Sequence, residues 1–455
     1  GGSVLSPTIA GYQEIAFPSD ALPGYFRVPY DLNRLAALVA EKYSLEYLPE
    51  VLLSGQAWFD KHTMGVWKDP ADGEVRFASP QAEARVVFDS HGGVALGSTA
   101  FNYNALHPDV QSRYLSFLDE VMAGAADTRS LIGVSSRLMI DWAFQGWNAT
   151  PYAHFLSPEL SVDYGDWTIA EHGADTGIDV PGAAGDPDRF QARYDFLTAA
   201  PQRDAWLAWR DGRIFDYHRR MREHLQAYKP DAQLLLPYHA TMATPHPGYH
   251  ENERERLRAI GVDLDMYAGE PNISLPPQAF YGRRRLGGTT VERMDAMMVE
   301  PLVSDAFASL AQTGVRATML WSSYFEVGGR LDWTELGGAT AGLGAFDACT
   351  PTGVYERELY AAALATSDAS LIINGGNGWI FGSTEALHPF LDEFNALPAR
   401  PFEPLAMARD PLAVWTRHDS ETFYFYAVNR LPYSVVASIA LANADTLVST
   451  RTGES

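Results

Sequence analysis

Two carboxylates that follow strand-like segments are the first candidates for chemistry in this sequence. Glu326 comes after the apolar run Ala317–Trp321, within the motif Tyr324-Phe-Glu-Val-Gly-Gly. Asp141 directly follows the segment Leu131–Ile140, whose composition predicts a strand. Hydrolysis of a glycosidic bond needs one protonated and one ionised carboxyl group, and burial against aromatic rings separates their pKa values. Glu326 is therefore a candidate nucleophile or base.

The sequence leaves the second carboxyl group open. Asp141 is one candidate for the acid, and Asp166 in the segment Asp163-Tyr-Gly-Asp is another. Thr168 and Glu171 have the spacing of a capping box, which predicts a helix start there and gives Asp166 the alternative role of a helix-start acid. Further alternatives are Asp163 itself and Glu270, which follows the predicted strand 262–267.

Aromatic and polar side chains near other predicted strand ends are candidates for substrate binding. Flat rings match the apolar faces of sugars, although aromatic residues also fill protein cores. His239 directly follows the predicted strand 233–237 and is placed to bind a hydroxyl group. The candidate substrate-binding residues are Trp142, His239, Tyr238, Trp321, Tyr324, Trp379 and Asn104.

A metal site is the less favoured alternative for the histidines. His246 and His250 are four residues apart, but Pro245 and Pro247 prevent the helix that would give this spacing its meaning. The sequence also has no glycine-rich phosphate loop after a strand and no Gly-x-Ser-x-Gly elbow. We therefore predict no metal and no cofactor, and keep a metal-dependent hydrolase built on His239, His246 and His250 as an alternative.

Composition narrows the classes of partner. The 34 Lys and Arg residues against 57 Asp and Glu give a net charge of −23, which repels nucleic-acid phosphates and anionic lipids. The single cysteine, Cys349, excludes an intramolecular disulfide framework. No apolar run reaches the length that a bilayer requires. We expect no nucleic-acid partner and no membrane insertion, whereas the oligomeric state stays open.

The elements that would position these residues alternate between strand and helix from about residue 30 to residue 400. Amphipathic periodicity predicts helices over 31–41, 109–122, 205–228 and 355–366. This alternation predicts an α/β fold with a parallel sheet, and the number of units favours a (β/α)8 TIM barrel over an open sheet. The segments 412–417, 422–429 and 434–441 alternate like antiparallel strands. We expect a barrel domain with extended βα loops over 1–400 and the start of a small β-sandwich over 401–455.

One stretch resembles a known family. Asp204-Ala-Trp-Leu-Ala-Trp-Arg, a long helix and then Tyr228-Lys-Pro-Asp resemble large bacterial barrel-type glycoside hydrolases, of the family-10-like and family-42-like groups. The resemblance spans about residues 30–400 and implies two Glu residues at the ends of strands four and seven. Glu326 matches the strand-seven position. At strand four, Asp141 stands in a Met-Ile-Asp-Trp sequence where the family has an Asn-Glu pair.

We therefore expect a secreted or periplasmic glycoside hydrolase that acts on a poly- or oligosaccharide without a cofactor. Glu326 would be the nucleophile or base, and Asp141 or Asp166 the acid. The missing strand-four Glu motivates an alternative, a non-catalytic carbohydrate-binding protein on a barrel scaffold.

Overall fold

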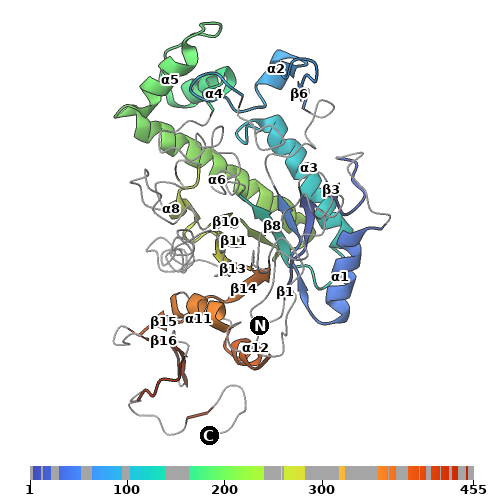
Figure 1. Ribbon diagram of the computed structural model, residues 1–455, viewed down its shortest axis with the longest axis vertical. Helices are drawn as coiled ribbons and strands as arrows, with labels where there is room; N and C mark the ends of the chain where they lie inside the picture. The colour runs from blue at the N-terminus through green and yellow to red at the C-terminus, as the bar shows by residue number, and fades with distance from the viewer. Residues whose placement is uncertain are drawn as a thin grey trace, which may run out of the picture. The chain divides into compact units, whose positions relative to one another are not determined.

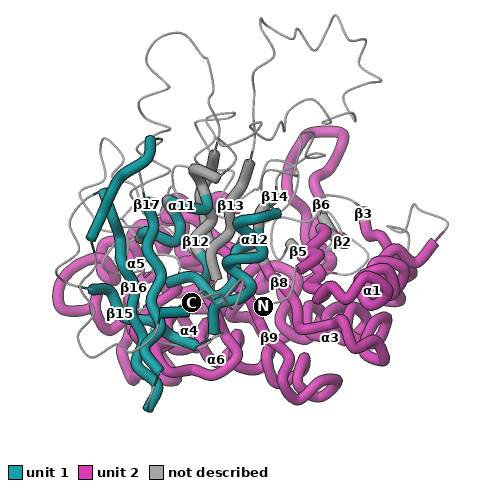
Figure 2. The backbone as a smooth tube through the Cα atoms, turned by 90° about the horizontal axis from the view of Figure 1, so that it is seen from below, with its two compact units in different colours: residues 1–2, 276–455 teal, residues 3–275 magenta. Residues whose placement is uncertain are grey.

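The computed structural model describes seventeen parts of the chain and divides it into two compact units, residues 3–275 and residues 1–2 with 276–455 (Figures 1 and 2). The described residues are 4–11, 14–21, 30–52, 64–94, 103–138, 163–239, 258, 261–281, 317–322, 357–366, 368–375, 388–398, 400–405, 411–420, 422–429, 433–438 and 447–448.

A mainly parallel sheet forms the centre of the unit 3–275. Its strand order is β11-β9-β8-β5-β2-β3, and only the β2–β3 pair is antiparallel. A separate parallel pair joins β1 to β4. The strands are β1 (Val4–Leu5), β2 (Thr8–Gly11), β3 (Glu14–Ile15), β4 (Glu46–Tyr47), β5 (Glu50–Leu52), β8 (Gly133–Arg137), β9 (Gln233–Leu235) and β11 (Ile273–Ser274).

Three helices pack beside one another along this sheet, in the order α1 (Leu32–Lys42), α3 (Pro108–Ala125) and α6 (Gln202–Tyr228) (Figure 1). They confirm three of the predicted helices. The buried Tyr114 of α3 bonds Ser136 of β8 through its hydroxyl group, at 2.9 Å. The core therefore lies between α3 and the strands that carry Ser136 and its neighbours.

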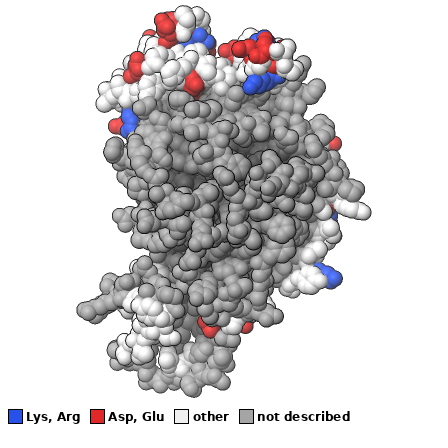
Figure 3. Space-filling view, in the orientation of Figure 1, with Lys and Arg blue, Asp and Glu red and all other residues white. Residues whose placement is uncertain are grey.

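Two long excursions interrupt the strand–helix alternation in this unit. Between β5 and α3 lie the hairpin β6 (Val66–Lys68)–β7 (Val75–Phe77) and the short helix α2 (Pro80–Glu83). Between β8 and α6 lie α4 (Asp166–Thr176) and α5 (Arg189–Thr198). Since β5 and β8 are parallel neighbours, both excursions begin on the side of the sheet where the carboxyl ends of the strands lie. Figure 3 shows charged side chains of both signs on the described surface around α2, α4 and α5.

The second unit combines a parallel sheet with an antiparallel one. Strands β12 (Pro277–Tyr281), β13 (Ala317–Ser322) and β14 (Leu371–Gly375) run parallel. Helix α11 (Arg357–Thr366) packs on the antiparallel sheet through Leu364, Ala369 and Val428. The antiparallel sheet consists of β15 (Glu403–Pro404), β16 (Leu412–Asp419) and β17 (Thr422–Asn429). The remaining element is the helix α12 (His388–Asn395).

The predicted α/β fold is confirmed, and two of the predicted elements are wrong. Residues 262–267 do not form a strand: Asp263 caps a helix, α8 (Leu264–Tyr267), by accepting the backbone N–H of Asp265 at 3.1 Å. In the predicted strand 434–441, the described residues 434–438 form no strand. Closure of the strands into a barrel and a complete β-sandwich stay predictions. Within the described parts of the chain, no helix combines the length and the apolar composition needed to cross a bilayer.

Candidate functional site

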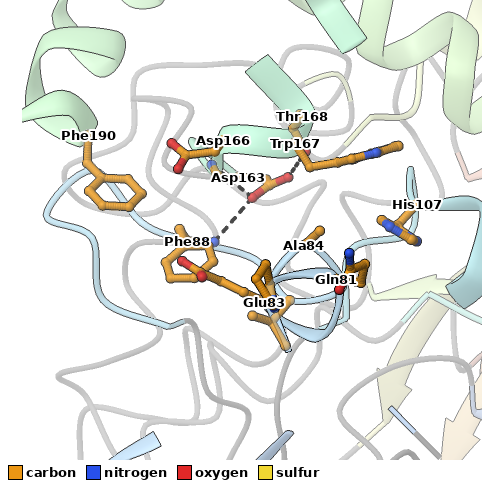
Figure 4. Close-up of a pocket in the computed structure, with 13 residues that line it drawn as sticks. Gln81, Glu83, Ala84, Phe88, His107, Asp163, Asp166, Trp167, Thr168 and Phe190 are labelled. Atoms are coloured by element: carbon orange, nitrogen blue, oxygen red, sulfur yellow. Dashed lines mark hydrogen bonds between the residues drawn. The ribbon is translucent and has the colours of Figure 1, made fainter. Parts of the chain in front are cut away.

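A pocket of about 400 Å³ lies between α2 and the start of α4 (Figure 4). The two excursions build it together, because one supplies residues 80–88 and 107 and the other supplies residues 163–168 and 190. The lining residues are Pro80, Gln81, Glu83, Ala84, Val86, Phe88, His107, Asp163, Gly165, Asp166, Trp167, Thr168 and Phe190.

Asp163 ties the two excursions together. Its Oδ1 accepts the backbone N–H groups of Phe88 (3.3 Å) and Gly165 (3.2 Å), as Figure 4 shows for Phe88. Its Oδ2 accepts the side-chain N–H of Asn104 at 2.6 Å and the hydroxyl of Thr168. The backbone of Asp163 is left-handed, with φ of 58°, a conformation that Asp tolerates better than most residues. The carboxylate is thus a structural link across the pocket wall.

Asp163 is only 3% exposed, and this burial raises the pKa of its carboxyl group to about 6. Asn104, a predicted substrate-binding residue, is itself buried, and its Nδ2 is shared between Asp163 and Thr168 Oγ1, the latter at 2.8 Å. Its Oδ1 accepts the backbone N–H of Leu106 at 3.0 Å. In the structure Asn104 therefore lies behind the pocket wall and holds Asp163.

Asp166 lies at the first residue of α4 and is bound by two guanidinium groups. Its Oδ1 is 3.0 Å from Nε of Arg189 and 2.7 Å from Nη2 of Arg193. The capping-box prediction is wrong, because the N-cap of α4 is Gly165, three residues before Thr168. Thr168 donates its hydroxyl to Asp163, and Glu171 pairs with Arg213 at 3.2 Å.

His107 and Trp167 lie at the end of the pocket opposite Phe190 (Figure 4). Their ring centroids are 4.6 Å apart. His107 caps α3: its Nδ1 accepts the backbone N–H of Asp109 at 3.1 Å, so the proton of the neutral ring is on Nε2. Burial lowers the pKa of His107, which keeps this ring neutral at pH 7.

Most of the other predicted site residues lie outside the described residues. These are Asp141, Trp142, His246, His250, Tyr324, Glu326 and Trp379. Tyr238 and His239 form the short strand β10 (Tyr238–His239), and Trp321 belongs to β13, but the structure describes only the backbone of these three. The structure therefore neither brings these side chains together nor separates them.

Glu270 has a position that differs from the prediction. It precedes β11 instead of following a strand, and its carboxylate pairs with Arg222 and, at 3.5 Å, with Arg219 of α6. A carboxylate at the amino end of a strand lies at the opposite edge of a parallel sheet from the βα excursions. Glu270 is thus a structural ion-pair partner of α6.

Sequence analysis did not identify Glu83, His107 and Trp167 as parts of one site. The local signals were present: Ser79 caps α2 by accepting the backbone N–H of Ala82 at 3.2 Å, and Trp167 follows the Asp163-Tyr-Gly-Asp segment. These residues belong to one site because the two excursions, which are far apart in sequence, contact each other and line the same pocket. Among the residues that the structure describes, no three His, Cys, Asp or Glu side chains are grouped to hold a metal ion.

Comparisons with known proteins give similar structures and no similar sequences. No family model matches the chain, and no curated protein matches it. The glycoside hydrolase domain of PgaB (BpsB) from Bordetella bronchiseptica is 14% identical with a TM-score of 0.44, over 85% of this chain and 86% of that chain. The catalytic domain of a β-amylase from Paenibacillus polymyxa is 9% identical with a TM-score of 0.40, over 82% and 84%. The chain thus resembles solved glycoside hydrolases in structure.

Proposed function

We propose that the chain is a glycoside hydrolase that uses Glu326 as nucleophile or base and Asp141 as acid. The observation that supports this proposal is where the parallel strands end. Strand β13 ends at Ser322, four positions before Glu326, and β8 ends at Arg137, four positions before Asp141. In α/β proteins with parallel strands, the residues after the carboxyl ends of the strands form the active site.

Asp166 is the weaker candidate for the acid. A general acid has to reach the glycosidic oxygen, whereas Oδ1 of Asp166 already contacts Nε of Arg189 at 3.0 Å and Nη2 of Arg193 at 2.7 Å. Those contacts give Asp166 a role in holding α5 against α4. The proposed pair is therefore Glu326 with Asp141.

The remaining features of the proposal follow from the same arrangement. The parallel strands of both units would belong to one (β/α)8 barrel, and the sheet β15-β16-β17 would begin a β-sandwich. The rings of Trp142, Trp321, Tyr324 and Trp379 would stack on sugar rings, and His239 with Tyr238 would bind hydroxyl groups. The substrate would be a poly- or oligosaccharide, met outside the cell or in the periplasm.

The test is a hydrolysis screen of the whole chain and of the variants E326Q and D141N. The substrates are neutral and acidic polysaccharides and aryl glycosides, and the product is measured as new reducing ends. We expect each variant to keep its folded state and to lose activity by about 10³-fold, as for removal of a general acid or base. E74Q, at an exposed glutamate in the β6–β7 turn, is the matched control and should keep full activity.

Other outcomes would contradict the assignment in distinguishable ways. Activity that survives in a folded E326Q variant would move the nucleophile or base to another residue. Binding of a polysaccharide without any new reducing ends would favour the non-catalytic carbohydrate-binding protein. Activity that is lost with a chelator and restored by zinc would favour the metal-dependent hydrolase.

A further inference from the structure

We propose that the pocket between α2 and α4 is a subsite for one ring of a neutral sugar chain. This inference rests on the proposed function, which it deepens by naming the class of sugar. The pocket has about 400 Å³, within the range of small-molecule sites. One of the two excursions that build the pocket also contains Asp141, since residues 163–168 and Asp141 all lie between β8 and α6.

The pocket offers apolar surface of the kind that binds the C–H faces of a sugar. Phe88 and Phe190 stack with ring centroids 5.4 Å apart at one end, and Trp167 lies toward the other end, beside His107 (Figure 4). Trp167 is partly exposed, whereas the two phenylalanines are buried. The indole ring is therefore the aromatic surface most accessible to a ligand.

The polar groups offer both donors and acceptors. His107 presents Nε2–H, since its Nδ1 accepts from Asp109, and this Nε2–H has no partner among the described residues. The carboxylate of Glu83 likewise has no partner within the described part of the chain, and Gln81 can donate and accept. A hydroxyl group both donates and accepts, so it can satisfy His107 and Glu83 alike. An ammonium group only donates and would leave His107 unmatched.

Charge selects against acidic sugars. Among the described residues that line the pocket, Glu83, Asp163 and Asp166 carry carboxylates and none is a lysine or arginine. The guanidinium groups of Arg189 and Arg193 stand outside the lining and are already paired with Asp166. With a net charge of −23 on the chain, a uronic or sulfated sugar would meet like charge and no lysine or arginine of the described lining.

The test is affinity electrophoresis in native gels that contain a neutral polysaccharide (laminarin, galactomannan, xyloglucan or agarose) or an acidic one (alginate, pectate or heparin). The protein is the full chain carrying E326Q, so that binding is measured without turnover. We expect retardation by at least one neutral polysaccharide and by none of the acidic ones. Adding W167A should weaken this binding about 10-fold, and adding E83Q by a smaller factor. The matched control is W209A, at a tryptophan of α6 outside the pocket lining.

Each outcome separates the subsite from the activity. Equal retardation of W167A and its parent, with both folded by thermal unfolding, would overturn the subsite even if E326Q abolishes hydrolysis. Retardation by acidic polysaccharides alone, or by none of the panel, would overturn it as well. Loss of binding in W167A but not in W209A supports the subsite, and it does so even if hydrolysis by the wild type survives E326Q and the proposed catalytic assignment fails.

Discussion

Two buried carboxylates in this chain are held in different ways. Asp163 accepts four hydrogen bonds, whereas Asp211 of α6 has one partner for Oδ2, Nε of Arg258 at 3.2 Å. Oδ1 of Asp211 has no hydrogen-bond partner within the described residues. Burial raises the pKa of Asp211 to about 6, although Arg210 and Arg258 favour its ionised form. Its ionisation therefore costs folding free energy.

We expect this cost to appear as a pH dependence of stability that D211N removes. Because the pKa of Asp211 is higher in the folded chain than the unfolded value of 3.8, its contribution is fully present below pH 3.8 and is lost as the pH rises through 6. The free energy of unfolding of the wild type, minus that of D211N, should fall by at most about 3 kcal/mol between pH 4 and pH 7. Urea unfolding at several pH values measures it.

The control for this experiment is D216N, at an exposed aspartate of the same helix. Its difference from the wild type should stay nearly constant over the same pH range. A difference for D211N that rises with pH would mean that Arg210 and Arg258 outweigh burial.

Single residues were predictable from the sequence as far as their local context defines their role. The sequence offers Asp166 as a catalytic acid or as a helix-start acid, and the structure has it begin α4. Its partners Arg189 and Arg193 come from the next helix, and no spacing rule identifies such a contact. In the same way, the role of Asn104 depends on Asp163, which is 59 positions away. Contacts between residues far apart in sequence thus decide the site, and periodicity does not encode them.

At the scale of elements, periodicity predicted helices better than it predicted their buried faces. Helix α1 forms where the apolar spacing indicated, but Leu35 and Leu38 are 50% and 44% exposed. The buried positions include Asn33, whose side chain bonds the hydroxyl of Tyr47 at 2.8 Å and the carbonyl of Val121 at 2.9 Å. A buried asparagine whose amide is hydrogen-bonded looks like a surface residue in a sequence. The buried face of α1 was therefore not predictable from the hydrophobicity of its residues.

Lys229, the residue after the end of α6, also makes hydrogen bonds that the sequence did not indicate. The segment Tyr228-Lys-Pro-Asp was predicted to stop the helix, which it does. In addition, Nζ of Lys229 donates to the carbonyl groups of Thr128 (3.1 Å) and Leu131 (2.6 Å). These carbonyls belong to the connection between α3 and β8, so one ammonium group links the ends of two βα units.

We expect K229M to destabilise the chain by about 1.5–3 kcal/mol, the usual range for hydrogen bonds to a charged group. Methionine keeps the length and apolar stem of the side chain but removes the donor. The measurement is the midpoint of urea unfolding, with K68M at an exposed lysine of β6 as the control. A K229M midpoint equal to that of K68M would show that water replaces the ammonium group without cost.

At the scale of the whole molecule, the strand–helix alternation correctly predicted an α/β fold. Closure of a barrel depends on pairing between its first and last strands, which the alternation of strands and helices in a sequence does not encode. The boundary near residue 400 also remains a prediction. Across it, the indole N–H of Trp415 donates to the carbonyl of Leu364 at 2.7 Å, and the Tyr426 hydroxyl donates to Asp368 at 2.8 Å. Helix α11 and the antiparallel sheet therefore share one core.

Two matched core variants would show which parts of the chain unfold together. Leu364 of α11 and Leu118 of α3 are both buried, one in each compact unit, and replacing either by alanine typically costs 2–5 kcal/mol. We expect L364A to weaken the hydrogen-exchange protection of β14, β16 and β17 while that of β8 stays unchanged, and L118A to do the reverse. Since the Leu364 core includes Val428, β16 and β17 should respond together with β14. Protection lost in β14 alone would favour a separate domain beyond residue 400, and equal loss everywhere would mean that the two units unfold as one.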